Sequence, residues 1–108
     1  MNKDEFIRFV AERSEFPLFL TRRFMDATIT SVKDIVLSGE KIYLRDFGTF
    51  YLNLRRGRIG RKVKTGDIIE IPPKYIPAFK PGEEFKRAAE KKHVPEWVYE
   101  EEENNDSD

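Results

Sequence analysis

Hydrophobic side chains recur at helical spacing near the start of the chain. Asn2, followed three residues later by Glu5, forms the pattern of a capping box, in which each side chain bonds the other residue's backbone amide at a helix start. Apolar residues at mixed helical spacing follow from Phe6 to Val10, ahead of Ser14. The pattern predicts a short first helix.

A longer helical pattern begins after Pro17, a residue that a first helical turn accepts. Apolar and small residues recur from Leu20 to Val36 at intervals of three, four and seven positions, and Gly39 is typical of the residue just beyond a helix end. The pattern predicts a second helix of about twenty residues. Because its apolar residues occupy more than one stripe, this helix has more hydrophobic surface than so small a monomer can bury.

The chain then changes to two-residue alternation, which is typical of strands. Ile42 and Leu44 alternate with more polar neighbours, and the alternation resumes from Phe50 to Leu54 after a turn that contains Gly48. We therefore expect two strands joined by a tight turn. The phenylalanines that fall on inward positions of the strands are predicted to be core residues rather than platforms for base stacking: Phe47, Phe50 and Phe79.

Residues 55–64 hold six cations, two glycines and no acid, so this segment cannot form a core. Turn-forming residues follow at 65–67, and alternation resumes from Ile69 to Ile71 until two prolines stop it at 72–73. The pattern predicts a hairpin with a basic tip. A basic stretch of this kind is otherwise a solvated loop that keeps the protein soluble.

The last third of the chain reads as a short strand, a helix and a tail. Tyr75 to Phe79 forms a short strand pattern between prolines, and residues 83–92 favour a helix after Gly82. From Pro95 onward the chain is acidic and polar, which is typical of a solvated tail. The tail contains one short hydrophobic group, which is either exposed with the rest of the tail or anchored on the body: Trp97, Val98 and Tyr99. The predicted inner face of the helix consists of Phe85, Ala88 and Ala89.

Charge is distributed unevenly along the 108 residues, which form a single domain by length. Twenty Lys and Arg balance twenty Asp and Glu, but seven of the acids follow Val94, so residues 1–94 carry 20 − 13 = +7. The chain has no cysteine, which excludes disulfides, Cys-ligated zinc and iron–sulfur clusters. No apolar run approaches the roughly 18 residues of a membrane span. His93 is the one histidine, and no motif pairs a nucleophile with a base, so we expect no catalytic site, metal or cofactor.

The residues resemble the bacterial HU/IHF family of DNA-bending proteins over positions 1–92. The resemblance rests on short motifs in order and at matching spacing, none of which is specific alone: Met1-Asn2-Lys3, Gly39, Phe47-Gly48-Thr49-Phe50, Gly60-Arg61, Thr65-Gly66, Ile71-Pro72 and Pro77-Ala78-Phe79-Lys80-Pro81-Gly82. It implies an α+β fold: an intertwined dimer with a helical base, a three-stranded antiparallel sheet and extended β-ribbon arms, here about residues 55–70.

The resemblance also implies the partners and the site residues. The arms would enter the minor groove of double-stranded DNA, with weak sequence preference and no chemistry. No membrane or small-molecule substrate is implied, and the location would be cytoplasmic and nucleoid-associated. Arg55, Arg58 and Arg61 match the arm cations, and Lys3 and Lys80 match body residues near phosphates. Further charge at the arm comes from Arg56, Lys62 and Lys64.

The chain departs from the family at Val63, where the family carries a proline that wedges between base pairs. DNA binding is therefore predicted more firmly than strong bending. The acidic tail of residues 93–108 extends past the family's usual end, and it either solubilises the protein or competes with DNA for the cationic surface. The sequence leaves open a homodimer or a heterodimer with a paralogue. It also leaves an alternative function, in which the same fold binds a protein partner through the tail and has reduced affinity for DNA.

Overall fold

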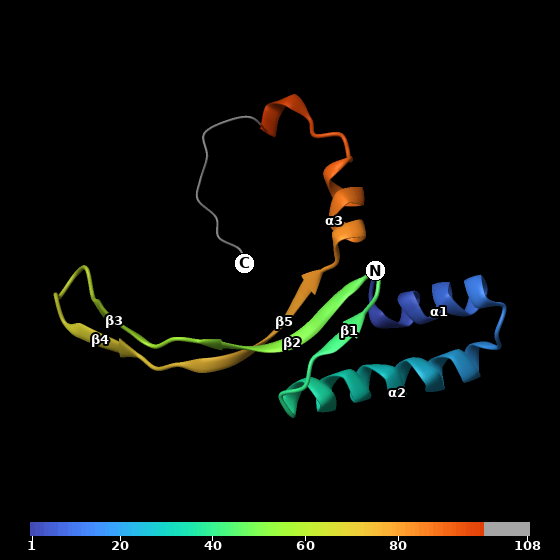
Figure 1. The fold of residues 1–108 in the computed structure, drawn as a ribbon, viewed down its shortest axis with the longest axis horizontal. Helices are drawn as coiled ribbons and strands as arrows, with labels where there is room; N and C mark the ends of the chain where they lie inside the picture. The colour runs from blue at the N-terminus through green and yellow to red at the C-terminus, as the bar shows by residue number, and fades with distance from the viewer. Residues whose placement is uncertain (99–108) are drawn as a thin grey trace.

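A computed structural model describes residues 1–98 of the chain (Figure 1). Helix α1, Lys3–Ser14, and helix α2, Leu18–Leu37, form an antiparallel hairpin. The predicted capping box is confirmed: the Glu5 amide donates to Asn2 Oδ1 at 2.8 Å, and the Asn2 amide donates to Glu5 Oε1 at 2.9 Å. These reciprocal bonds satisfy two amides that lack partners within the helix.

Helix α2 has the predicted length, but its start differs by one position. Pro17 lies at the N-cap rather than in the first turn, and its carbonyl accepts from both the amide and the hydroxyl of Thr21, each at 3.0 Å. A proline suits this position because it has no amide to satisfy. At the other end of the helix, Gly39 has φ +96°. This left-handed conformation commonly follows a helix end, and glycine adopts it most easily.

Three strands form the antiparallel sheet of the body, in the order β1–β2–β5. They are β1, Ile42–Leu44; β2, Gly48–Arg55; and β5, Lys74–Pro81. The fold class predicted from the sequence, α+β with a three-stranded antiparallel sheet, is confirmed. The predicted boundaries of the last strand, Tyr75 to Phe79, were wrong, because β5 has eight residues and extends from Lys74 to Pro81. It forms an edge of the sheet, where an absent amide need not interrupt pairing.

A second, two-stranded sheet forms the arm. Strand β3, Arg58–Arg61, pairs with β4, Ile68–Ile71, and this ribbon extends away from the helices (Figure 1). The predicted hairpin with a basic tip is thus confirmed, and half of the basic stretch is strand rather than loop.

The chain continues from β5 into helix α3, Glu83–Glu90, which ends two residues earlier than predicted. A single turn of 3-10 helix, Glu96–Val98, closes the described part of the chain, with the Trp97 side chain 78 % exposed. Tyr99 and the acidic run 100–103 lie outside the described residues. Within residues 1–98 no helix has the length and hydrophobicity that crossing a membrane requires.

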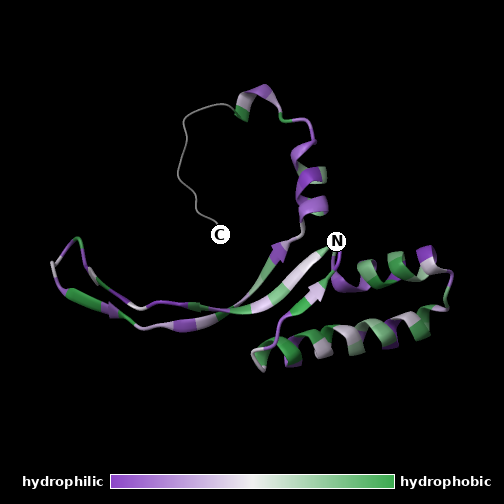
Figure 2. Ribbon diagram, viewed as in Figure 1, coloured by the Kyte–Doolittle hydropathy of each residue, from purple (hydrophilic) through white to green (hydrophobic). Residues whose placement is uncertain are grey.

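Little of the hydrophobic surface is buried in one chain. Among the described hydrophobic residues, Ile7, Ala11 and Val36 are buried, and apolar positions recur along the whole length of α1 and α2 (Figure 2). A groove of about 390 Å³ opens between α2 and the inner face of the sheet. Its apolar lining comprises Val32, Val36, Leu37, Phe50, Pro77, Ala78 and Phe79.

The predicted phenylalanine core is present as a cluster centred on Phe47. Its ring centroid lies 5.1 Å from that of Phe79, 5.6 Å from Phe85 and 6.3 Å from Phe50, distances typical of packed aromatic pairs. Even so, Phe47 is 44 % exposed in the single chain. The cluster therefore has an open side.

Candidate nucleic-acid interface

The arm presents cations and aliphatic side chains together. Cross-strand pairing places Arg58 opposite Ile71 and Arg61 opposite Ile68. Because successive side chains of a strand point to opposite faces, each face of the ribbon carries an arginine beside an isoleucine. Ile59 is 72 % exposed. The arm isoleucines were not among the predicted site residues, although they alternate with cations in the sequence.

The tip of the arm is closed by a compact turn. The Lys62 amide donates to the Asp67 carbonyl, and the Gly66 amide donates to the Lys62 carbonyl, both at 2.8 Å. Gly66 has φ +77°, a conformation that side chains disfavour. Arg61 Nη1 donates to the Gly66 carbonyl at 3.4 Å. These bonds leave Val63 at the apex, 99 % exposed, where an apolar side chain has no packing role.

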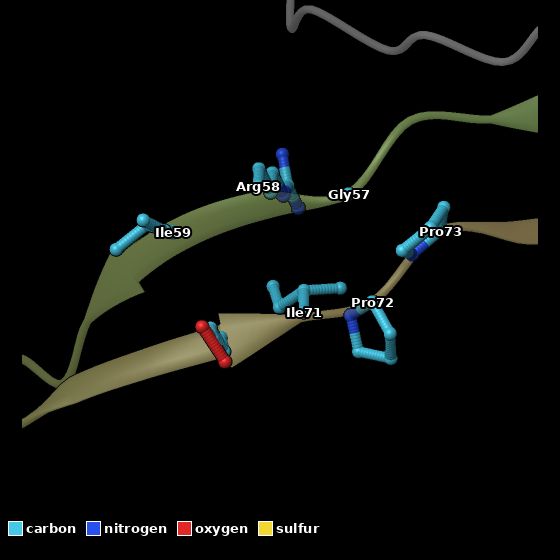
Figure 3. A pocket seen from close by; sticks show the side chains of 7 residues that line it. Gly57, Arg58, Ile59, Ile71, Pro72 and Pro73 are labelled. Atoms are coloured by element: carbon cyan, nitrogen blue, oxygen red, sulfur yellow. The ribbon is translucent and has the colours of Figure 1, made fainter.

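The root of the arm is a local interruption of pairing (Figure 3). Strands β2 and β5 pair as far as Arg55 and Lys74, and pairing resumes in the same register at Arg58 and Ile71. Two prolines fill the gap on one strand at residues 72–73, and they remove two amides from the ladder.

Gly57 lies across the gap from these prolines. A Cβ atom there would lie 2.8 Å from the Ile71 carbonyl oxygen and 2.9 Å from Pro73 Cδ. An open cavity of about 700 Å³ lies at this point, where the body sheet and the arm meet. Glycine is therefore required by the close approach of the two strands.

All six arm cations predicted from the sequence are exposed: Arg55, Arg56, Arg58, Arg61, Lys62 and Lys64. The ion pairs found within residues 1–98 join other residues, so none of these cations is neutralised there by a carboxylate. The arm therefore projects six positive charges that form no ion pair within residues 1–98, beside exposed aliphatic side chains.

The two body lysines have different surroundings. Lys3, the first residue of α1, forms an ion pair with Asp26 of α2, with 2.8 Å between Nζ and Oδ1. Lys80 lies on β5 opposite Thr49 and takes part in none of the ion pairs of the described residues. The structure thus gathers the arm residues on one ribbon and places Lys3 and Lys80 on separate elements of the body.

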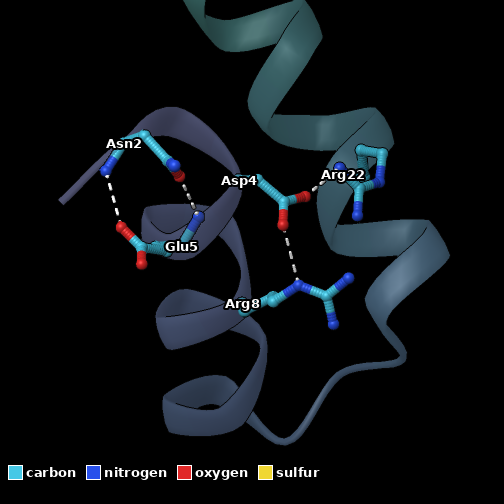
Figure 4. Close-up of polar contacts among 5 residues, drawn as sticks. All are labelled: Asn2, Asp4, Glu5, Arg8 and Arg22. Atoms are coloured by element: carbon cyan, nitrogen blue, oxygen red, sulfur yellow. Dashed lines mark hydrogen bonds and ion pairs between the residues drawn. The ribbon is translucent and has the colours of Figure 1, made fainter.

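A second set of ion pairs ties α1 to α2 beside Lys3 (Figure 4). Asp4 accepts from Arg8 Nε at 2.9 Å and from Arg22 Nη1 at 2.8 Å. The hydrogen bond from Arg8, followed by that from Arg22, lowers the pKa of the Asp4 carboxyl below its ordinary value. The bond between Asp4 and Arg22 thus links α1 to α2 next to Lys3.

The described residues contain no group of three or more His, Cys, Asp or Glu side chains arranged to hold a metal ion. What the surface offers instead is charge and shape: an extended ribbon with exposed cations, and an apolar apex. Such a surface is suited to a polyanion with grooves.

Comparisons with known proteins agree with this geometry. The family model described as "Bacterial DNA-binding protein" matches residues 1–90. The chain is 42 % identical over 88 residues to DNA-binding protein HU 1 of Bacillus subtilis, covering 82 % of this chain and 96 % of that one. It is 38 % identical over 87 residues to integration host factor subunit beta of a Marinomonas species, covering 80 % and 85 %. Among solved structures, an Anabaena HU–DNA cocrystal structure superposes with a TM-score of 0.75 at 33 % identity, covering 85 % of this chain and all of that one. The chain therefore belongs to the bacterial DNA-binding protein family that includes HU and the integration host factor subunits.

Proposed function

We propose that the protein binds double-stranded DNA as a dimer and bends or compacts it through its two arms. Each arm, about residues 55–70, enters the minor groove, while Lys3 and Lys80 approach the backbone of the same duplex. The observation that carries this proposal is the arm itself, which extends from the body with six exposed cations that no carboxylate of the described residues neutralises. No residue of β3 or β4 is buried, so the protein's own core does not explain why this ribbon is present, whereas a bound partner would cover its surface.

Binding of this kind depends on charge and shape rather than on base identity. Lysines and arginines that neutralise phosphates release counterions, which makes affinity strongly dependent on salt and weakly dependent on sequence. The likeness to an HU–DNA cocrystal structure supports the same mode. The protein is an architectural component of the nucleoid, in the cytoplasm, and works without catalysis.

The dimer follows from the surface that one chain leaves uncovered. The groove between α2 and the sheet is lined almost wholly by apolar side chains, and the Phe47 cluster beside it is open on one side. An obligate dimer interface resembles a domain core cut in half. A second copy, or a paralogue with the same inner face, completes this core.

Residues 1–92 form the DNA-binding domain in this proposal, and residues 93–108 form an acidic tail. The tail is the basis of the alternative function, in which the fold binds a protein partner and DNA affinity is low. Changing Glu100 to Glu103 together to glutamine removes four of the seven acids that follow Val94 and leaves the length of the chain unchanged. Under the DNA-binding proposal this variant binds DNA at least as tightly as the parent.

The proposal is tested by a mobility-shift titration of the full chain on linear, nicked and four-way-junction DNA across a range of salt. We expect binding to all three substrates, with affinity that falls steeply as salt rises. Bound complexes should contain two protein chains. Salt-insensitive or absent DNA binding by a folded, tail-intact protein would favour the interaction role instead.

The apex of the arm sets how far the DNA bends. If the tip enters the base stack, unstacking costs a few kcal/mol per step and is offset by apolar contact and extra wrapped surface. Valine keeps an amide that insertion desolvates, and it lacks the flat ring of proline. We therefore expect Val63→Pro to increase the bend of a short duplex measured by fluorescence transfer between its ends, with binding retained.

Val63→Ala is the companion variant in the same assay. It should lower the preference for nicked DNA only modestly, because most of the affinity is electrostatic. An unchanged bend in Val63→Pro, together with an unchanged preference in Val63→Ala, would show that the tip stays outside the stack.

A further inference from the structure

The charge of the arm is matched by the acidic tail of the same chain. Six cations lie on residues 55–64 of the arm, and none of them belongs to an ion pair within residues 1–98. Six carboxylate side chains follow the described part of the chain, at positions 100–103, 106 and 108. No lysine or arginine is interspersed with them. The two segments therefore carry equal and opposite charge.

The hydrophobic residues of the two segments match as well. Trp97 is 78 % exposed and Val98 is 45 % exposed, immediately ahead of the acidic run. On the arm, Ile59 and Ile68 are exposed beside the arginines. A segment whose only role is solubility is typically poor in aromatic residues. An apolar group followed by carboxylates is instead complementary to a ribbon on which isoleucines alternate with arginines.

The acidic run is long enough to lie along the arm. The strand that leads from Arg55 to Val63 at the apex spans about 26 Å, at about 3.3 Å per residue. The ten residues that follow Val98 can extend over about 35 Å. In Figure 1 the 3-10 turn Glu96–Val98 lies on the side of α3 toward which the arm extends. Because both segments belong to one molecule, each meets the other at an effective concentration of order millimolar.

A duplex can displace such an occupant from the arm. Exposed ion pairs are individually weak and are screened by salt. Residues 100–108 carry six acidic side chains, about one charge per 5 Å of extended chain, whereas duplex DNA carries about one per 1.7 Å of its axis. DNA therefore attracts the arm cations more strongly than the tail does. The tail lowers the affinity for DNA without abolishing it.

We propose that the acidic tail is an internal competitor of DNA. Without a duplex, its carboxylates neutralise the arm cations and Trp97 contacts the exposed isoleucines of the arm, and DNA binds the arm by displacing the tail. This inference rests on the proposed DNA-binding function and adds a regulator of the same site. Its consequence is that the affinity of the parent and the salt dependence of that affinity are both lower than those of the arms alone.

The first test measures binding to a linear duplex by fluorescence anisotropy, using full-length chains over a range of salt. The tail variant combines Glu100→Gln, Glu101→Gln, Glu102→Gln and Glu103→Gln. It should bind about three- to tenfold more tightly than the parent near 50 mM salt, and its slope of log K against log salt should be steeper. The two affinities should converge as salt rises, because salt releases the tail of the parent from the arm.

A matched control variant carries four glutamate-to-glutamine changes on the body. The positions are exposed and belong to none of the ion pairs of the described residues: Glu12, Glu40, Glu84 and Glu90. The net charge changes equally in both variants, but the control variant should keep the slope of the parent and gain less affinity. Equal gains in the two variants would overturn the inference, while salt-dependent binding by the parent left the proposed function intact. A folded parent that bound no DNA would overturn the proposed function itself.

Trp97 is the one tryptophan of the chain, so its fluorescence reports on the tail in the absence of DNA. At low salt, acrylamide should quench the emission of the parent less than that of the tail variant, and at high salt the two should be quenched equally. Combining Lys62→Gln with Lys64→Gln should raise the quenching too, because it removes part of the arm surface that the tail occupies. A parent quenched as strongly as the tail variant at low salt would overturn the inference, whatever the DNA titrations gave.

Discussion

Replacing Phe47 with alanine is expected to destabilise the folded protein by about 3 to 5 kcal/mol, the usual cost of removing a buried phenylalanine. The side chain contacts three other aromatic rings that come from β2, β5 and α3, so its loss opens a cavity where three elements meet. In one chain its ring is only partly covered. The full effect therefore requires the partner chain to cover the open side of the cluster.

Denaturant unfolding at a fixed protein concentration measures this loss. Tyr43→Ala is the matched control, since it removes a similar aromatic volume from the exposed face of the same sheet, and it should cost less than about 1 kcal/mol. Because dimer stability depends on concentration, the midpoint should also rise with protein concentration for the parent. A midpoint for Phe47→Ala that equals the parent's would exclude Phe47 from a shared core.

Much of the fold is predictable because its signals are local. The capping box at Asn2 and Glu5 and the terminal Gly39 are set by residues within one turn of each helix end, and both are present as expected. The turn before Gly48 and the break at residues 72–73 follow from the conformational limits of glycine and proline in the same way. Local rules of this kind do not depend on what packs against them.

The errors concern residues whose role depends on neighbours distant in sequence. A short strand was expected from Tyr75 to Phe79, but β5 extends to Pro81 because the strand lies at the sheet edge. The need for glycine at position 57 could not be predicted from the sequence, because it arises from the close approach of Pro73 on the opposite strand. The row formed by Tyr43, Thr49 and Lys80 was not predicted, because only the strand register places these residues side by side.

The sequence predicts which residues form the candidate site, but only partly how these residues are arranged and paired. Six cations without an acid identify the arm from the sequence, and all six are exposed in the structure. What composition did not indicate is that Lys3 is paired with Asp26 whereas Lys80 is not. Binding of a phosphate by Lys3 must therefore compete with a carboxylate 2.8 Å away, and Lys80 carries no such cost from the described residues.

The double substitution Arg58→Ala with Arg61→Ala is expected to have the largest effect on DNA binding. It removes four arginines from a dimer, two from each arm, on side chains that are exposed and unpaired with carboxylates in the described structure. If each contacts a phosphate, the slope of log K against log salt falls by up to about 3.6. Over a range from about 50 to about 200 mM salt, the parent then loses roughly a hundredfold more affinity than the variant does.

The loss should be similar on every duplex sequence, because phosphate contacts carry no base information. Arg58→Lys with Arg61→Lys is the control: it conserves charge, so it should keep most of the slope, while any loss of affinity reports the bidentate geometry that only the guanidinium group supplies. Anisotropy titrations on two unrelated duplexes separate these contributions. An alanine variant whose affinity and slope match the parent's would mean that the arm is a solvated loop, and the body lysines Lys3 and Lys80 would then have to account for whatever DNA binding remains.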